Sequence, residues 1–142
     1  MSRVQKKRLN RSSKKMPSKE DQILKVLTED LQRLEDIHAC MVARKNLEGI
    51  APITEEFKKE VMEIWEILKK TMDDFFDVIA HYSEFGLDKV YFELGKFDVM
   101  FFILPGTDTA LVAIVPALAN RGLLEVEMEN ARRKIISIIE GK

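Results

Sequence analysis

Few side chains in this sequence have the type and spacing that catalysis or metal binding requires. Cys40 is the single cysteine and lies in the apolar run ACMV (39–42), which favours a small buried hydrophobic residue over a nucleophile. His38 and His81 are far apart, and no acidic or cysteine neighbour repeats at the spacing of metal ligands. We therefore expect both histidines to be structural or surface residues.

Longer catalytic signatures are not found either. The sequence holds no P-loop, no glycine-rich phosphate turn after a strand and no HExxH zinc motif. Met62, Trp65 and Met72 could line a ligand site, but at helical spacing such side chains are more typical of a core or an interface. We expect a protein that is not an enzyme and that has no metal and no cofactor.

A cluster of basic residues near the N-terminus has a chemistry of its own. Residues 1–19 carry eight basic side chains and no acidic one. Clustered lysine and arginine favour contact with a polyanion, either nucleic acid or an anionic membrane surface, but no aromatic side chain is interleaved that would stack on bases. The candidate polyanion contacts are Lys6, Lys7, Arg8, Arg11, Lys14 and Lys15.

Two other interpretations of this basic segment stay open. Residues 1–17 hold too few apolar side chains for a fixed structure, so residues 1–18 are predicted to form a disordered, solvated arm. A transit peptide would share the basic, serine-bearing composition, but the arm lacks an apolar face, and no signal-peptide pattern follows it. Met16, which directly precedes the globular pattern, is a second candidate for the native start.

The composition indicates one folded domain after the arm. The 142 residues are 46% hydrophobic and 33% charged, which is typical of a soluble globular protein, and their number fits one domain. Eight of the 23 basic residues lie within residues 1–19, so the other 15 stand against 24 acidic residues, a net charge of −9 for the rest of the chain. A single cysteine is compatible with a reducing compartment, and we expect a cytoplasmic protein.

The elements that must position these residues are clearest around the most apolar stretch, residues 97–116. Its length matches a membrane span, but Gly95-Lys96 just before it fits a two-residue hairpin loop. Folding the chain there sorts the side chains onto two faces: Val90, Phe92, Leu94, Phe97, Val99 and Phe101 on one, and Tyr91, Glu93, Asp98 and Met100 on the other. The sequence PGTD (105–108) then breaks the apolar run. We predict a strand, a turn and a strand, and no transmembrane segment.

Three amphipathic patterns predict helices. The first helix runs from about 19 to 36 after a Ser18 cap, the second from 54 to 84 after a Thr54 cap, and the third follows residues 120–122. Their apolar stripes step by three or four residues: Ile23, Leu27, Leu31 and Leu34; Phe57, Val61, Ile64, Leu68, Met72, Phe75 and Ile79, widened by Trp65 and Phe76; and Leu124, Met128, Ala131, Ile135 and Ile138.

The remaining strands complete the predicted fold. Residues 38–44 predict a strand, with a turn at 46–49 and a return strand at 50–53 that lies at a sheet edge because Pro52 cannot donate to a ladder. Residues 109–117 are apolar on both faces, so we place that strand at the centre. The order is α-β-β-α-β-β-β-α, an α/β (α+β) fold with a five-stranded, mainly antiparallel sheet flanked by three helices.

This order resembles the roadblock family, which is named after a dynein light chain. The best local match is ALVAIVPALANRGLLEVEMENARRKI (110–135), which is similar to that family's last strand, a polar turn and a helix that opens with leucine. The residues that carry the turn and helix start are Asn120, Gly122, Leu123 and Leu124. The resemblance implies a roadblock-like domain over residues 19–142, and it departs from the family at 46–49, where an Asp-Gly-type turn is usual.

The resemblance implies a non-catalytic interaction module. Roadblock-like domains pair through their third strand and the neighbouring long helix, and they bind or regulate small Ras-like GTPases or act as assembly scaffolds. We therefore expect a homodimer whose partner is a small GTPase or a scaffold protein. By position in the fold, the dimer interface would contain the exposed face of helix 54–84 and Lys89, Val90, Tyr91, Phe92, Glu93 and Leu94.

The third strand also predicts a pairing register. Two copies that pair antiparallel about a two-fold axis at Tyr91 would set Lys89 against Glu93 twice. Within one chain, Glu93 stands opposite Asp98 in the predicted hairpin, so the partner's lysine would offset a conflict between like charges.

Two further function classes were weighed. A small-molecule sensor of the PAS or GAF type shares the helix-flanked antiparallel sheet, but it needs a polar-lined cavity, whereas the predicted core consists of Phe, Leu, Val and Ile. A nucleic-acid binder is the third alternative, and the acidic body restricts any such contact to the arm.

Overall fold

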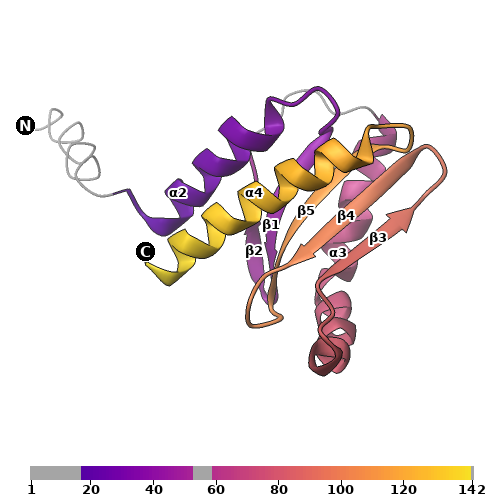
Figure 1. The fold of residues 1–142 in the computed structure, drawn as a ribbon. Coiled ribbons are helices and arrows are strands. Elements are labelled where there is room, and N and C mark those ends of the chain that lie inside the picture. Colours follow the sequence, from indigo (N-terminus) through magenta and orange to yellow (C-terminus); the bar gives the residue numbers. More distant parts are fainter. Residues whose placement is uncertain (1–16, 53–58, 142) are drawn as a thin grey trace, which may run out of the picture.

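The computed structural model describes residues 17–52 and 59–141, which form an antiparallel sheet between two layers of helix (Figure 1). The predicted order α-β-β-α-β-β-β-α is confirmed. The elements are α2 (Lys19–Val26) with a π-helical continuation (Leu27–Gln32), β1 (Ala39–Arg44), β2 (Leu47–Ile50), α3 (Lys59–Tyr82) with a 3-10 turn (Ser83–Phe85), β3 (Lys89–Glu93), β4 (Phe97–Ile103), β5 (Thr109–Pro116) and α4 (Arg121–Glu140). Most of the predicted arm and the predicted helix start at Thr54 lie outside the described residues.

The five strands lie in the order β2-β1-β5-β4-β3, and every neighbouring pair is antiparallel. β5 is at the centre, as predicted, because its side chains are apolar on both faces and both faces are covered. β2 and β3 are therefore the two edges of the sheet.

The helices divide between the two faces of the sheet (Figure 1). The apolar residues of α2 and α4 share one core with one side of the strands, and those of α3 share a second core with the other side. The buried stripe of α3 contains the predicted Val61, Leu68, Met72 and Ile79 together with Trp65 and Phe76, which widen it as predicted. The predicted Ile64 and Phe75 lie half-buried beside it.

The hairpin of β3 and β4 has the predicted register. Phe92 is opposite Val99 and Glu93 is opposite Asp98, and Gly95 has a φ of 85°, a left-handed value that glycine adopts without strain. The stretch 97–116 is thus a strand, a turn and a strand. Within the described parts of the chain, no helix is long and apolar enough to span a membrane.

The hairpin of β1 and β2 corrects the prediction. The turn is Lys45-Asn46 rather than 46–49, and β2 begins at Leu47 instead of Ile50. Asn46 adopts a φ of 61°, which asparagine tolerates, so the chain reverses before Gly49 is reached. Gly49 instead lies within β2, where an added Cβ would come 3.2 Å from the carbonyl oxygen of Val42. Pro52 follows the strand, and β2 is an edge, as predicted.

Side-chain caps fix where the two terminal helices begin. Ser18 Oγ accepts a hydrogen bond from the N–H of Asp21 at 3.1 Å, as the predicted cap requires. Asn120 Oδ1 accepts from the N–H of Leu123 at 3.1 Å, so α4 starts directly after the turn that follows β5. The cap sets which α4 residues face the sheet, and this places Arg121 beside the end of β3.

Candidate self-association surface

An open apolar groove lies between α3 and β3. It has a volume of about 330 Å³ and is lined by Ile64, Ile67, Leu68, Thr71, Phe75, Phe92, Leu94 and Val99. Ile67 is 60% exposed and Leu94 is 49% exposed. Phe75 stacks on Phe92 with ring centroids 4.9 Å apart, which ties the helix to the strand. Helix and strand thus form one continuous apolar surface.

This surface continues along α3 as a second apolar stripe. Val78, Tyr82 and Phe85 follow the groove at spacings of four and three residues, and each is more than half exposed. The helix therefore has one apolar stripe that is buried against the sheet and another, beside it, that faces solvent. A contiguous apolar surface of this kind is typical of a protein–protein interface.

The strand beside the groove has one open edge. The N–H of Leu94 donates to the carbonyl oxygen of Phe97 at 2.8 Å, and the N–H of Ile103 donates to that of Asp88 at 2.9 Å. Because hydrogen-bonded pairs alternate along an antiparallel ladder, these two bonds fix the pattern of the whole hairpin. The backbone groups of Lys89, Tyr91 and Glu93 point away from β4, where another strand could pair with them.

The six residues predicted for a dimer interface fall into two sets. Phe92 and Leu94 line the groove and Val90 packs against the α3 core, whereas Lys89, Tyr91 and Glu93 have their side chains on the α4 face. The structure brings the first set together with the exposed stripe of α3. The second set is already engaged by residues of α4.

The predicted conflict between Glu93 and Asp98 is offset within a single chain. Asp98 is only 4% exposed and forms an ion pair with Arg121, whose guanidinium also lies 3.7 Å from the carboxylate of Glu93. The sequence had suggested that a partner's lysine offsets this conflict. Because Arg121 already does so, the partner's lysine is not required for it. Arg121 was overlooked because nothing in the chain order places the start of α4 beside this hairpin.

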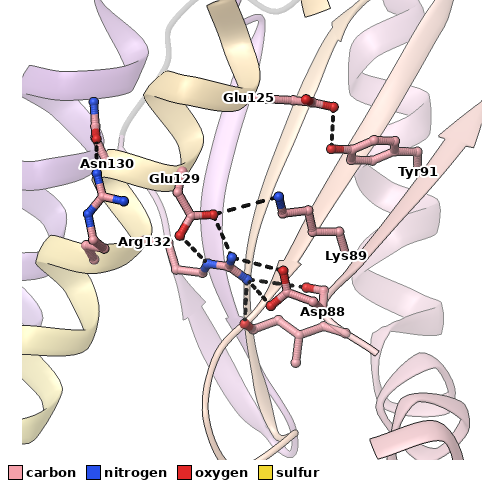
Figure 2. A network of polar contacts seen from close by, with 9 residues as sticks. Asp88, Lys89, Tyr91, Glu125, Glu129, Asn130 and Arg132 are labelled. Carbon is pink, nitrogen blue, oxygen red and sulfur yellow. Dashed lines mark hydrogen bonds and ion pairs between the residues drawn. The ribbon is translucent and has the colours of Figure 1, made fainter. Parts of the chain in front are cut away.

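A buried cation anchors the start of β3 (Figure 2). Arg132 is 7% exposed and donates to both carboxylate oxygens of Asp88, at 2.8 and 3.1 Å, and to Glu129 at 2.6 Å. Burial alone would lower the pKa of Arg132, but the hydrogen bonds to Asp88 and Glu129 outweigh it and raise the pKa. The charged guanidinium thus holds the loop that leads from α3 into β3.

Tyr91 is held from the same helix. Its hydroxyl donates to Glu125 at 2.7 Å, and burial together with this hydrogen bond raises the pKa of Tyr91 to about 12. These α4 residues were not predicted from the sequence, although Arg121, Glu125 and Glu129 recur at a spacing of four on one face of the helix.

The other candidates that lie within the described residues do not form a site. Cys40 is buried, and burial raises the pKa of its thiol to about 12, so it is a poor nucleophile. His38 packs edge-on against Phe97, and His81 is exposed. No group of three metal-ligating side chains occurs in residues 17–52 and 59–141. The candidate polyanion contacts at residues 6–15 lie outside these ranges.

The ligand-lining set suggested by the sequence is likewise dispersed. Trp65 and Met72 are buried in the α3 core, whereas Met62 is 41% exposed. This distribution agrees with the expected role in a core or an interface.

Comparisons with known proteins give relatives in fold alone. No protein-family model matches the sequence, and no curated protein matches it. Among solved structures, Myxococcus xanthus MglB is similar over 87% of this chain and 89% of its own, with a TM-score of 0.61 and 14% sequence identity. MglC from Myxococcus xanthus is similar over 78% of this chain and 96% of its own, with a TM-score of 0.52 and 15% identity.

Proposed function

Since the chain has a roadblock-type fold, we propose that it is a homodimeric, non-catalytic interaction module that binds or regulates a small Ras-like GTPase or acts as an assembly scaffold. One observation carries the self-association: an apolar groove and an open strand edge lie side by side. A second copy of the same chain offers the matching strand edge and the matching apolar surface, so a two-fold arrangement satisfies both at once.

The open edge favours one pairing register. The outward backbone groups belong to Lys89, Tyr91 and Glu93. An antiparallel partner strand must bring its own outward residues opposite these, and a two-fold axis at Tyr91 pairs all of them, with Lys89 opposite the partner's Glu93. In this arrangement the two α3 helices lie on the same face of a continuous sheet, and the two apolar grooves close against each other.

The oligomeric state tests the surface directly. We expect a dimer at micromolar concentration in sedimentation equilibrium. Ile67→Glu places a charge in the groove and should raise the dissociation constant at least about tenfold, because a charge buried without a partner is costly. The matched control is Leu47→Glu, since Leu47 is 65% exposed but lies on β2, at the opposite edge. A wild-type mass of 16.4 kDa throughout that range would overturn the proposal.

The choice of partner is tested with small Ras-like GTPases loaded with GDP or with a GTP analogue. We expect the chain to bind one nucleotide state more tightly, or to change the rate of nucleotide exchange or hydrolysis, without hydrolysing nucleotide itself. A stable complex that ignores the nucleotide state would favour the scaffold role. Hydrolysis by the chain alone that survives repurification would contradict the non-catalytic assignment.

The core gives the sensor alternative no support. Asp98 and Arg132 are the buried charged residues of the described chain, and both have ion-pair partners in the same chain. A ligand-binding core would instead direct polar groups into a cavity.

A further inference from the structure

Helix α4 and strand β3 are joined by a ladder of polar contacts (Figure 2). Four rungs follow one another: Arg121 with Glu93 at 3.7 Å and, as Figure 2 shows, Glu125 with Tyr91 at 2.7 Å, Glu129 with Lys89 at 3.8 Å, and Arg132 with Asp88 at 2.8 Å. The first three rungs hold every second residue of β3 at successive turns of α4, and the fourth holds Asp88, which directly precedes the strand. We call these contacts the α4 ladder.

Successive contacts of the α4 ladder stay aligned because two residues of the strand and four residues of the helix advance by nearly the same distance. Two residues of a strand advance about 6.6 Å, and four residues of a helix advance about 6.0 Å. The charges also specify one register, since a shift of β3 by two residues would set Glu93 against Glu125. The ladder therefore fixes the position of the strand along the helix and not merely its proximity to it.

The three β3 residues that the ladder holds are those whose backbone faces the open edge. Lys89, Tyr91 and Glu93 direct their side chains to α4 and their N–H and C=O groups away from β4. A partner strand can pair with these N–H and C=O groups only if they lie in one plane and at the spacing of regular β-sheet hydrogen bonds. An edge strand such as β3 is prone to fray because only one of its sides is paired. The α4 ladder fixes β3 in addition to its pairing with β4.

We propose that α4 positions β3 for self-association, so that α4 residues that need not touch the second copy set the strength of the dimer. The inference rests on the proposed function, because it concerns the same strand edge. It adds a route of regulation: a ligand or partner protein that displaces a rung from α4 would loosen β3 and weaken pairing. Glu125, Glu129 and Arg132 are positioning residues in this arrangement.

The central rung gives the sharpest test. Tyr91→Phe removes the hydroxyl, and Glu125→Ala removes its acceptor from the α4 side. Each should raise the dimer dissociation constant by about three- to tenfold in sedimentation equilibrium. The dimer dissociation constant of the double variant should be no higher than that of the weaker-pairing single variant, because both changes break the same contact. Glu127→Ala, a carboxylate on the same helix outside the ladder, should leave the constant unchanged.

A second readout separates positioning from contact with the partner copy. In an Ile67→Glu background, at a concentration well below the raised dimer dissociation constant, amide hydrogen exchange reports on β3 of the monomer alone. Glu125→Ala should speed exchange of the Val90 and Phe92 amides, which pair with β4, about three- to tenfold, whereas Glu127→Ala should not. Such a change shows that the ladder holds the strand before any partner is present.

The outcomes are distinguishable. Weaker pairing together with faster β3 exchange supports the proposal. Unchanged exchange overturns it, and so does an effect of Tyr91→Phe without one of Glu125→Ala, since the hydroxyl would then act on the partner copy directly. A monomeric wild-type chain overturns the proposed function itself, and that result needs no substitution to be seen.

Discussion

At the scale of single residues, the two buried charges of the described chain differ in how they are compensated. Arg132 is shared between two carboxylates and two backbone carbonyl oxygens. Asp98 depends mainly on Arg121, which also serves Glu93. Removing one member of such a buried pair costs more than the pair contributes, because the remaining charge stays out of water.

Arg121→Met should therefore lower the free energy of unfolding by about 2 kcal/mol. Asp98→Asn added to it should recover more than half of the loss, since the uncompensated charge is then gone. Urea denaturation measures both. Arg133→Met, at an exposed position of the same helix, should change stability by less than about 0.5 kcal/mol. If Arg121→Met is as harmless as this control, the Asp98 pair does not stabilise the fold.

Cys40 should behave as a buried hydrophobic residue. Burial raises the pKa of its thiol from the ordinary 9.0 to about 12. Between these two pH values the folded state keeps the thiol proton, whereas the unfolded state loses it. The resulting stability is fully present below pH 9 and is lost as the pH rises towards 12. At pH 8, iodoacetamide should label Cys40 only in denaturant. Labelling of the native protein at the rate of a free thiol would show that this burial is wrong.

At the scale of elements, the sequence predicted those hairpins and helices that are determined by residues close together in the chain. The β3–β4 hairpin follows from a glycine turn and an alternation that agree with each other. The β1–β2 hairpin was misplaced because Gly49 was taken for a turn residue, whereas it serves a close approach to Val42 within β2. The exposed apolar stripe of α3 was not identified from the sequence, and Ile64 and Phe75 were assigned to the buried stripe, since periodicity alone does not show which apolar residues meet the sheet.

The α4 ladder was beyond prediction because its rungs join residues more than 25 positions apart in the chain, from Arg121–Glu93 to Arg132–Asp88. A helix with charges at a spacing of four is ordinarily a solvated face. Only the stacking of α4 on the sheet selects β3 as its partner.

The proposed register makes a forecast about mixed chains. In Glu93→Lys homodimers lysine meets lysine, and in Lys89→Glu homodimers glutamate meets glutamate, so each variant should pair more weakly than wild type. Mixed together, they should form a heterodimer, because both cross-strand pairs are then opposite in charge. The swaps disturb Arg121 and Glu129 equally in homodimers and heterodimers, so these effects cancel. Native mass spectrometry of the mixture counts each species, and a statistical distribution would exclude a two-fold axis at Tyr91.

At the scale of the whole molecule, the two helical layers have different tasks. The α3 layer provides the apolar surface, whereas the other layer carries the ladder and both ends of the described chain (Figure 1). Lys19 at the start of α2 donates to the carbonyl oxygen of Ile139 near the end of α4, at 2.9 Å. The two ends of the domain are thus tied to each other.

Removal of residues 1–16 should leave the melting temperature within about 1 °C of the full chain, because the Ser18 cap and the Lys19 contact remain. Removal of two further residues also deletes the cap, which costs about 1 kcal/mol and should lower the melting temperature by about 4 °C. Differential scanning calorimetry compares the two truncations. A loss of several degrees with the shorter truncation would show that the arm contributes to the fold.

The open edge of β3 also has a consequence for valency. A two-fold axis that relates antiparallel strands runs perpendicular to their sheet, so both copies present α2 on the same side. If the basic residues that precede α2 bind an anionic surface, as their composition predicts, the two copies of a dimer would bind one surface together, and the second contact would profit from the effective concentration set by the first. In that case Ile67→Glu, which keeps every basic residue of the segment, should weaken binding to anionic vesicles as well. The avidity for an anionic membrane would then depend on the open edge of β3, which does not itself contact the membrane.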